Sequence, residues 1–301
     1  MAERIAAIDC GTNSIKILIG ELPHVLVRES RMVRLGQGVD TTRLLRDDAL
    51  ARTFAAIDEY AALVREYDVT RLRFCATSAT RDAHNALVFT DGVRERLGVT
   101  PEVLSGDEEA ALVFDGAVSH LREPVEEPVL VVDIGGGSTE LVLGGDRPDT
   151  AVSMDIGSVR LHERHLHDDP PTAAQVAACL ADVDRHLEES PVPLGDARSV
   201  IGTSGTIKTL AAAMLDLPVY DRDAIDGADL GSAETAAYVE SLMAMTVAER
   251  LSIPSMHPGR ADVIGAGALI WARVLGRSGV ERYRVSEADI LYGIATSLVA
   301  P

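Results

Sequence analysis

The loop at 133–140, DIGGGSTE, combines glycines with hydroxyl and carboxylate side chains, the residue types that bind phosphate groups and their metal ions. Three consecutive glycines lie between Asp133 and Glu140. Glycines let a ligand approach the backbone closely. Paired carboxylates supply the hard oxygen ligands that Mg²⁺ accepts together with phosphate oxygens and water. The loop therefore predicts a phosphate site beside a divalent metal. The alternative is a glycine-rich hairpin whose acids are simply solvated.

Two further loops predict anion sites, DCGTNS at 9–14 and GTSGTIK at 202–208. In the first, small residues suit a tight turn whose backbone N–H groups face an anion, although a purely structural turn uses the same residues. The second is expected between a strand and a helix, where helix N-terminal amides bind phosphate. It lacks the spacing of a Walker motif. The two lysines of the chain, Lys16 and Lys208, lie in or beside these loops, and an ammonium group suits a phosphate.

Two other segments carry charged side chains after small residues, SGDEEA at 105–110 and ATSATR at 76–81. Adjacent carboxylates at a helix start usually serve as caps that match the helix dipole, but one of them can also act as a general base. Arg81 follows small residues at a strand end, a pattern that a capped helix with an exposed arginine also produces. Three histidines within 162–167 fit no tetrahedral zinc spacing, so we expect them on the surface.

An internal repeat relates two of these loops. The segment IAAIDCGTNSIKILIG (5–20) aligns with VLVVDIGGGSTELVLG (129–144) at a constant offset of 124 residues. Each copy contains a buried strand, an Asp, a glycine-containing turn and a second strand. A repeat of this length predicts two similar domains.

Strand-length apolar runs alternate with helical patterns along the rest of the chain, which predicts α/β layers. Further strands are expected at 73–76, 102–104 and 199–201. Further helices are expected from Asp47 or Asp48 to about 67, from Asp107, at 172–189, from about 206, and at 233–244, 261–275 and 288–299. Two prolines and three glutamates within 122–128 mark the expected domain junction.

The composition narrows the class of protein. A chain of 301 residues with 47% apolar and 25% charged residues predicts about two soluble globular domains. Three cysteines fit reduced thiols, and no signal peptide or long apolar run is present, so we expect a cytoplasmic protein without a membrane segment. The net charge of −19 disfavours duplex nucleic acid as a partner.

Taken together, seven motifs in order resemble the exopolyphosphatase and guanosine pentaphosphate phosphohydrolase family, and they cover nearly the whole chain. They are DCGTNS, ATSATR, SGDEEA, DIGGGSTE, GSVRL (157–161), GTSGTIK and SEADILYG (286–293). The resemblance implies an α/β protein with the duplicated actin-like (ribonuclease H-like) two-domain fold and an active site in the interdomain cleft. It also implies an N-terminal domain at 1–125, joined by the last helix at 288–301, and a second domain at 126–287.

The same resemblance implies hydrolysis of a terminal phosphoanhydride by a water that Glu109 activates. Asp133 and Glu140 would hold Mg²⁺ or Mn²⁺. The substrate phosphates would be bound by Asp9, Gly11, Thr12, Asn13, Ser14, Arg81, Gly135, Gly136, Gly137, Ser138, Gly202, Ser204, Gly205 and Lys208. Phosphoryl transfer requires mainly positioning and charge neutralisation, which these residue types provide. Cys10 and Thr12 stand where the family more often has an aliphatic residue and a serine, and we interpret Cys10 as structural.

The expected substrate is inorganic polyphosphate, and a homodimer is expected from the family. Longer family members continue with a helical HD-type domain, for which 301 residues leave no room. We therefore expect a preference for short chains, unless arginines at 28–46 form a basic groove. The alternatives are guanosine pentaphosphate, which would connect the protein to the stringent response, a sugar-kinase-like phosphotransferase, and a non-enzymatic nucleotide-gated protein of the actin or chaperone type.

Overall fold

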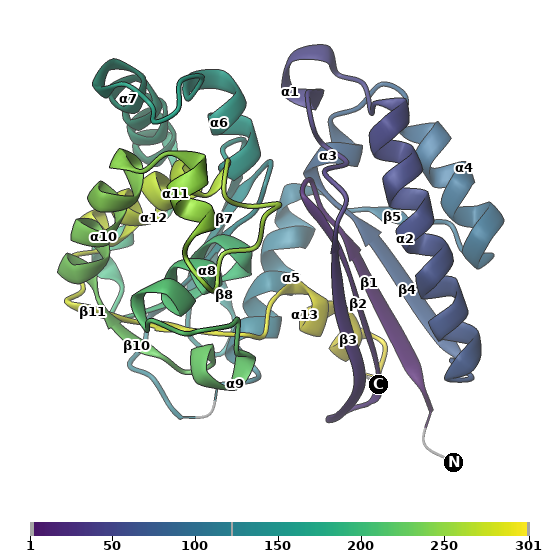
Figure 1. Ribbon diagram of the computed structural model, residues 1–301. Helices are drawn as coiled ribbons and strands as arrows, with labels where there is room; N and C mark the ends of the chain where they lie inside the picture. Colours follow the sequence, from purple (N-terminus) through teal and green to yellow (C-terminus); the bar gives the residue numbers. More distant parts are fainter. Residues whose placement is uncertain (1–2, 122, 300–301) are drawn as a thin grey trace. The chain divides into compact units, whose positions relative to one another are not determined.

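The two copies of the sequence repeat form matching antiparallel hairpins, one in each of two β-sheets (Figure 1). The computed structural model describes residues 3–121 and 123–299. Ile5 pairs with Gly20 and Val129 pairs with Gly144, so the register keeps the offset found in the sequence. The hairpin strands are β1 (Ile5–Cys10), β2 (Ser14–Glu21), β6 (Val129–Ile134) and β7 (Thr139–Gly144).

The remaining strands extend both hairpins in the same way. The first sheet has the order β3-β2-β1-β4-β5 and the second the order β10-β11-β9-β6-β7-β8. In each sheet the first hairpin strand pairs in parallel with a later strand, β4 or β9. The added strands are β3 (His24–Met32), β4 (Arg71–Ala76), β5 (Glu102–Val103), β8 (Pro148–Met154), β9 (Ser199–Thr203), β10 (Asp229–Gly231) and β11 (Arg282–Val285).

The chain divides into two compact units. One comprises Met1–Gly116 and Ile290–Pro301, and the other comprises Ala117–Asp289. Each unit has its own buried apolar cluster, which includes Tyr60 in the first and Trp271 in the second. The last helix therefore packs with the first unit.

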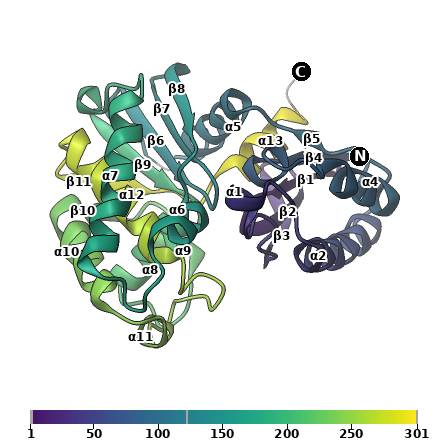
Figure 2. The same cartoon turned by 90° about the horizontal axis from the view of Figure 1, so that it is seen from above.

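In the first unit, helices lie on both faces of the sheet. Figures 1 and 2 show α2 and α4 on one face and α13 on the other. The expected helix from Asp47 is confirmed, although Arg46 occupies the N-cap without a side-chain bond and the two aspartates lie in the first turn. The helices are α1 (Val39–Thr42), α2 (Asp47–Glu66), α3 (Ser78–Arg81), α4 (Ala86–Leu97), α5 (Gly106–Val118) and α13 (Ile290–Ser297).

In the second unit, the central helix is α12, whose Trp271 packs edge-to-face on Tyr283 with ring centroids 4.9 Å apart. The helix expected at 172–189 begins with a capping box between Thr172 and Gln175. The helices are α6 (Ser158–His165), α7 (Ala173–Glu189), η1 (Leu194–Asp196), α8 (Ser204–Met214), α9 (Arg222–Ile225), α10 (Ser232–Ala244), α11 (Val247–Leu251) and α12 (Ile264–Ser278).

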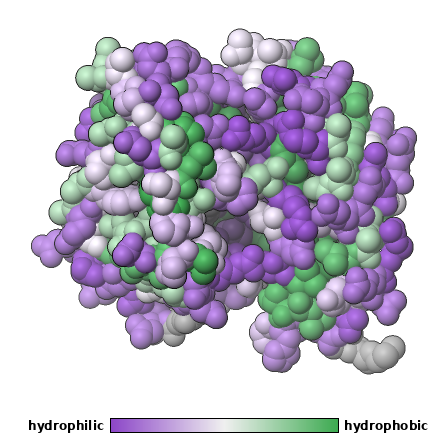
Figure 3. All heavy atoms as spheres, in the orientation of Figure 1, coloured by the Kyte–Doolittle hydropathy of each residue, from purple (hydrophilic) through white to green (hydrophobic). Residues whose placement is uncertain are grey.

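The side chains on the surface and the state of the cysteines are those that the composition predicts for a globular protein with reduced thiols. Hydrophilic side chains cover most of the face seen in Figure 3. Cys10, Cys75 and Cys179 are buried free thiols. Burial raises the pKa of the Cys75 and Cys179 thiols to about 12, so both stay protonated at neutral pH. Among the described residues, no helix is both long enough and apolar enough to span a lipid bilayer.

Candidate active site

The loop that follows β6 turns its carbonyl groups toward donors of the protein. The five carbonyl oxygens from Ile134 to Ser138 each accept a hydrogen bond of 2.7–3.1 Å. Their donors are, in order, the Ser204 hydroxyl, the Ser158 N–H, the N–H groups of Val159 and Arg160, the Arg160 Nε–H and the Gly135 N–H. Most of these donors belong to the first turn of α6, which therefore fixes the backbone of this loop.

The N–H groups of the same loop point the other way. A trans peptide is planar, so the N–H that follows each carbonyl points opposite to it. The N–H groups of Gly136, Gly137 and Ser138 thus point away from α6, and none has an acceptor within residues 3–121 and 123–299. Gly137 and Ser138 are buried, where unpaired N–H groups are rare. Successive N–H groups of this kind form a concavity that binds anions.

The loop between β1 and β2 repeats this arrangement. The Gly11 N–H donates to the Ser14 carbonyl at 3.0 Å, as Gly135 does to Ser138. The carbonyl groups of Thr12 and Asn13 accept from main-chain N–H groups of residues 33–36 at 2.9–3.0 Å. The N–H groups of Thr12 and Asn13 donate to no acceptor in the part of the chain that the structure describes. Both residues are buried, with exposed fractions of 7% and 8%. This loop is therefore a second candidate phosphate site.

Asp133 and Glu140 lie directly opposite each other on β6 and β7. Both are buried, and the Ser153 hydroxyl donates to Glu140 Oε1 at 2.8 Å. The equivalent pair of the first hairpin is Asp9 and Lys16, an ion pair of 3.2 Å. The second hairpin thus has a carboxylate in place of the lysine. Like charges at facing positions repel, and two carboxylates are a donor set that suits a divalent cation.

The described residues contain no group of three or more His, Cys, Asp and Glu side chains that could hold a metal ion. A metal at Asp133 and Glu140 would therefore complete its shell with water and phosphate oxygens. This fits Mg²⁺, which commonly keeps several waters and binds through one or two carboxylates.

The two adjacent carboxylates of α5 have different surroundings. Glu108 is exposed and forms a capping box with Ser105, whose N–H lies 2.9 Å from Glu108 Oε2. The hydrogen bonds from the Ser105 N–H and hydroxyl lower the pKa of Glu108. Glu109 is 7% exposed, and Arg81 Nη1 donates to its Oε2 at 3.0 Å. Glu108 thus stabilises the helix end, and Glu109 is the candidate base.

Arg81 connects Glu109 to the backbone before α5. Its Nη1 also donates to the Leu104 carbonyl at 2.8 Å. Its Nε and Nη2 donate to no acceptor among the residues that the structure describes. The guanidinium can therefore hold Glu109 with one nitrogen and bind a phosphate oxygen with the others.

Lys208 lies in a different environment from the one expected of a phosphate ligand. It is 3% exposed, and its Nζ lies 2.8 Å from the Glu287 carbonyl and 3.0 Å from Asp289 Oδ2. These contacts connect α8 to the SEADILYG segment. The hydroxyl of Ser204 is similarly engaged, since it donates to the Ile134 carbonyl at 2.8 Å and accepts from the Ile134 N–H at 3.1 Å. The phosphate roles of Lys208 and Ser204 stay predictions.

Arg260 is a candidate that the sequence analysis missed. Its guanidinium lies against the backbone of Gly205, so closely that a side-chain carbon on Gly205 would overlap it. A cation thus lies beside the loop at 202–208. In the sequence, Arg260 lies within the segment GRAD at 259–262. This segment carries no recognised phosphate motif, so no pattern identified Arg260.

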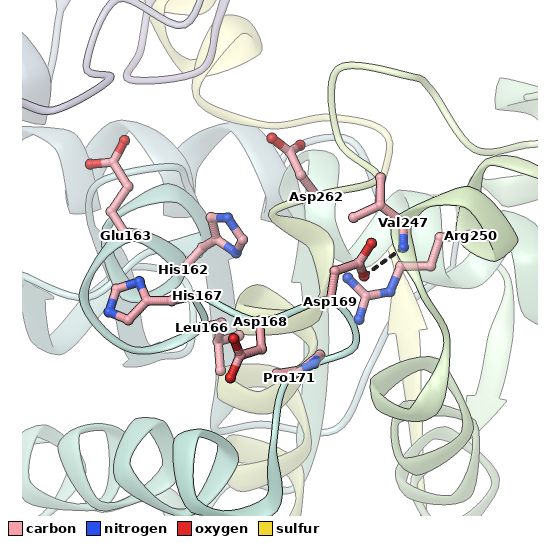
Figure 4. A pocket seen from close by; sticks show the side chains of 10 residues that line it. All are labelled: His162, Glu163, Leu166, His167, Asp168, Asp169, Pro171, Val247, Arg250 and Asp262. Carbon is pink, nitrogen blue, oxygen red and sulfur yellow. Dashed lines mark hydrogen bonds between the residues drawn. The ribbon is translucent and has the colours of Figure 1, made fainter.

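Within the described residues, the histidines of 162–167 belong to no group of three or more His, Cys, Asp and Glu side chains that could hold a metal ion. His167 is exposed as expected, whereas His162 and His165 are half-buried. His165 Nε2 lies 2.9 Å from Asp182 Oδ2. A separate cavity of about 490 Å³ lies beside α6, and Figure 4 shows the side chains that line it. Its lining residues are His162, Glu163, Leu166, His167, Asp168, Asp169, Pro171, Val247, Arg250 and Asp262.

Two of the arginines at 28–46 that were considered for a basic groove form ion pairs with acidic side chains. Arg31 pairs with Glu29 and Glu59, and Arg46 pairs with Asp48. The Arg28 guanidinium lies 5.1 Å from the centre of the Tyr292 ring.

Comparison with known proteins gives matches over nearly the whole chain. Residues 15–295 match the profile described as the Ppx/GppA phosphatase family. The chain is 45% identical to Exopolyphosphatase 2 of Mycobacterium tuberculosis, over 98% of both proteins.

Two solved structures give the same result. One, a crystal structure of an exopolyphosphatase-like protein, matches with a TM-score of 0.95 and 44% identity, over 98% of both chains. Another, an exopolyphosphatase from Cytophaga hutchinsonii, matches with a TM-score of 0.89 and 29% identity, over 99% of this chain and 98% of that chain. The α/β class with a duplicated actin-like core, expected from the sequence, is confirmed.

Proposed function

The chain belongs to the Ppx/GppA phosphatase family, and from this we propose that it is an exopolyphosphatase that releases orthophosphate from the end of inorganic polyphosphate. The observation that carries the proposal is the row of backbone N–H groups at Gly136, Gly137 and Ser138. They have no acceptor within the described residues. A polyanion with a phosphate oxygen every few ångströms matches such donors without requiring a base or sugar pocket.

The remaining roles follow from the surroundings of each side chain. Glu109 is the base that takes a proton from the attacking water, and Arg81 orients its carboxylate. Asp133 and Glu140 hold Mg²⁺ or Mn²⁺, which neutralises charge on the phosphoryl oxygens when it is bound. The N–H groups of the two hairpin loops and the free nitrogens of Arg81 bind phosphate oxygens. Since the water is the nucleophile, the reaction needs no serine or cysteine nucleophile.

Phosphate release tests the substrate directly. We expect turnover of inorganic polyphosphate when chains of several lengths, pyrophosphate and guanosine pentaphosphate are compared at matched ionic strength and saturating Mg²⁺. Release from guanosine pentaphosphate alone would show that the substrate assignment is wrong. No release from any of them, in Mg²⁺ or Mn²⁺, would contradict the proposal as a whole. The cytoplasmic location stays a prediction from the composition, and the homodimer stays an expectation from the family resemblance.

Replacing either carboxylate of the metal site is expected to weaken metal binding. Asp133→Asn and Glu140→Gln each remove one charged oxygen ligand, and we expect each to raise the Mg²⁺ concentration for half-maximal activity by roughly tenfold or more. Direct Mn²⁺ binding, followed by electron paramagnetic resonance, measures the same loss without turnover.

Asp149→Asn is a matched control for this prediction. It removes one negative charge from an exposed position on β8, in the same sheet. Its metal dependence should equal that of the wild type. Unchanged Mn²⁺ affinity in both Asp133→Asn and Glu140→Gln would remove these residues from the metal site.

A further inference from the structure

Arg160 has no role in the reaction described above, yet it contacts the loop at 135–138 at two points. This loop, which carries the N–H groups of Gly136, Gly137 and Ser138, is called the phosphate loop below. Arg160 lies at the third position of α6 and is 5% exposed. Its Nε donates to the Gly137 carbonyl at 2.7 Å, and its main-chain N–H donates to the Gly136 carbonyl at 3.1 Å. A buried guanidinium thus lies behind the loop whose N–H groups face the other way.

The helix that carries Arg160 approaches the loop as closely as the backbone allows. A side-chain carbon on Gly157, the N-cap of α6, would lie 2.6 Å from the Gly136 carbonyl group and 2.7 Å from the Gly137 nitrogen. Real side-chain carbons do not come this close, so glycine is required here by the close approach. The helix and the loop therefore form one rigid backbone contact.

The bond from Arg160 acts on a specific N–H group. The Gly137 carbonyl belongs to the same peptide as the Ser138 N–H, and the two point in opposite directions. Fixing the carbonyl therefore fixes the direction of the N–H. The bond is charge-assisted, and such bonds are stronger than neutral ones. A cation on the carbonyl oxygen also polarises the peptide, which makes its N–H a stronger donor.

We propose that Arg160 is a positioning residue that aims and strengthens the Ser138 N–H, and through α6 the neighbouring N–H groups of Gly136 and Gly137, as phosphate donors. The proposal rests on the phosphate-binding role of this loop in the proposed function. The side chain acts through the Gly137 carbonyl, and its effect on the phosphate is indirect. Gly157, the N-cap of α6, and Arg160, within α6, thus both support the loop at 135–138. They lie about twenty residues further along the chain than the loop.

The test is the affinity for phosphate in Arg160→Met and Arg160→Lys. Methionine keeps the apolar part of the side chain and removes the donor, and we expect the inhibition constant of inorganic phosphate to rise by about tenfold. That factor is the lower end expected for loss of a hydrogen bond to a charged group. Lysine keeps a charged donor that can reach the Gly137 carbonyl, so it should restore part of the affinity. The Mg²⁺ dependence should stay the same in both variants.

Arg250 provides a matched control in the same unit (Figure 4). It is 3% exposed and also donates to main-chain carbonyls, those of Leu242 at 3.1 Å and Ala261 at 3.3 Å. Neither carbonyl belongs to the phosphate loop. Arg250→Met should therefore lower the thermal unfolding midpoint with no change in phosphate inhibition once the protein is folded.

Several results would overturn the proposal. It fails if Arg160→Met lowers the unfolding midpoint as Arg250→Met does and leaves phosphate inhibition unchanged. It also fails if the metal requirement changes in place of the phosphate affinity. If Arg160→Met does not fold, Arg160→Lys and Arg160→Gln carry the same comparison. Calorimetric titration of the wild type and variants with inorganic phosphate separates this proposal from the proposed function, because it detects the site even where polyphosphate is not hydrolysed.

Discussion

Glu109→Gln is expected to lower kcat by about 10²–10⁴-fold, the usual contribution of a positioned general base. Glutamine has nearly the same shape, and its carbonyl oxygen can still accept the bond from Arg81 Nη1, which is 3.0 Å in the wild type. The fold and KM should therefore change little. Single-turnover phosphate release, measured at saturating metal, gives the effect on the chemical step separately from product release.

Glu108→Gln is the natural control, because it makes the same chemical change one residue earlier. Glu108 is exposed and accepts from the Ser105 N–H at 2.9 Å. Removing its charge should reduce stability only slightly, as for other charges at a helix N-terminus, and should leave kcat close to that of the wild type. An inactive Glu108→Gln with a fully active Glu109→Gln would reverse the assignment.

The sequence predicts the centre of both sheets because the signal there is local. Each repeat copy contains a continuous apolar run followed by an aspartate and a glycine turn, and the structure confirms these hairpins with their register. The strand that follows each hairpin, β3 in the first sheet and β8 in the second, was not expected. Both strands lie on the outer side of a hairpin, and most of their residues are partly or fully exposed, so their apolar pattern is weak.

The sequence predicts only those parts of the site whose residues are adjacent in the chain. The glycines of 135–137 and the flanking carboxylates identify a phosphate and metal site without further help. The supports of that loop come from distant segments: Ser204 is 70 residues from Ile134 and Arg160 is 23 residues from Gly137. No spacing rule connects such residues. For the same reason the partners of Lys208, 79 and 81 residues away, could not be foreseen.

Lys208→Ala is expected to reduce the free energy of unfolding by about 3–5 kcal/mol, the usual cost of removing one partner of a buried ion pair. Asp289 is 1% exposed and lies 3.0 Å from the ammonium group, so the substitution leaves its charge buried without that cation. At roughly 2–4 °C per kcal/mol for a unit of this size, the thermal unfolding midpoint should fall by about 10 °C. Lys16→Ala provides a comparison. Lys16 pairs with Asp9 at 3.2 Å, but its side chain is 18% exposed, so the loss of stability should be smaller.

A second substitution separates a structural Lys208 from a phosphate ligand. In Lys208→Met with Asp289→Asn, the ammonium and its nearer carboxylate are removed together. Glu287, whose Oε2 lies 3.8 Å from the ammonium in the wild type, keeps the hydrogen bond from the Tyr220 hydroxyl at 2.6 Å. Replacing a buried pair by uncharged residues is often neutral, so we expect this double variant to recover more than half of the lost stability. If Lys208 instead binds phosphate, the double variant stays defective in KM however well it folds, since no ammonium remains to meet the substrate. Equilibrium urea unfolding and KM for polyphosphate decide between these outcomes when both are measured on the wild type, Lys208→Ala and the double variant. Recovered stability with a KM near that of the wild type assigns Lys208 to the support of α8, whereas a KM that stays high in a stable double variant restores the role expected from the sequence.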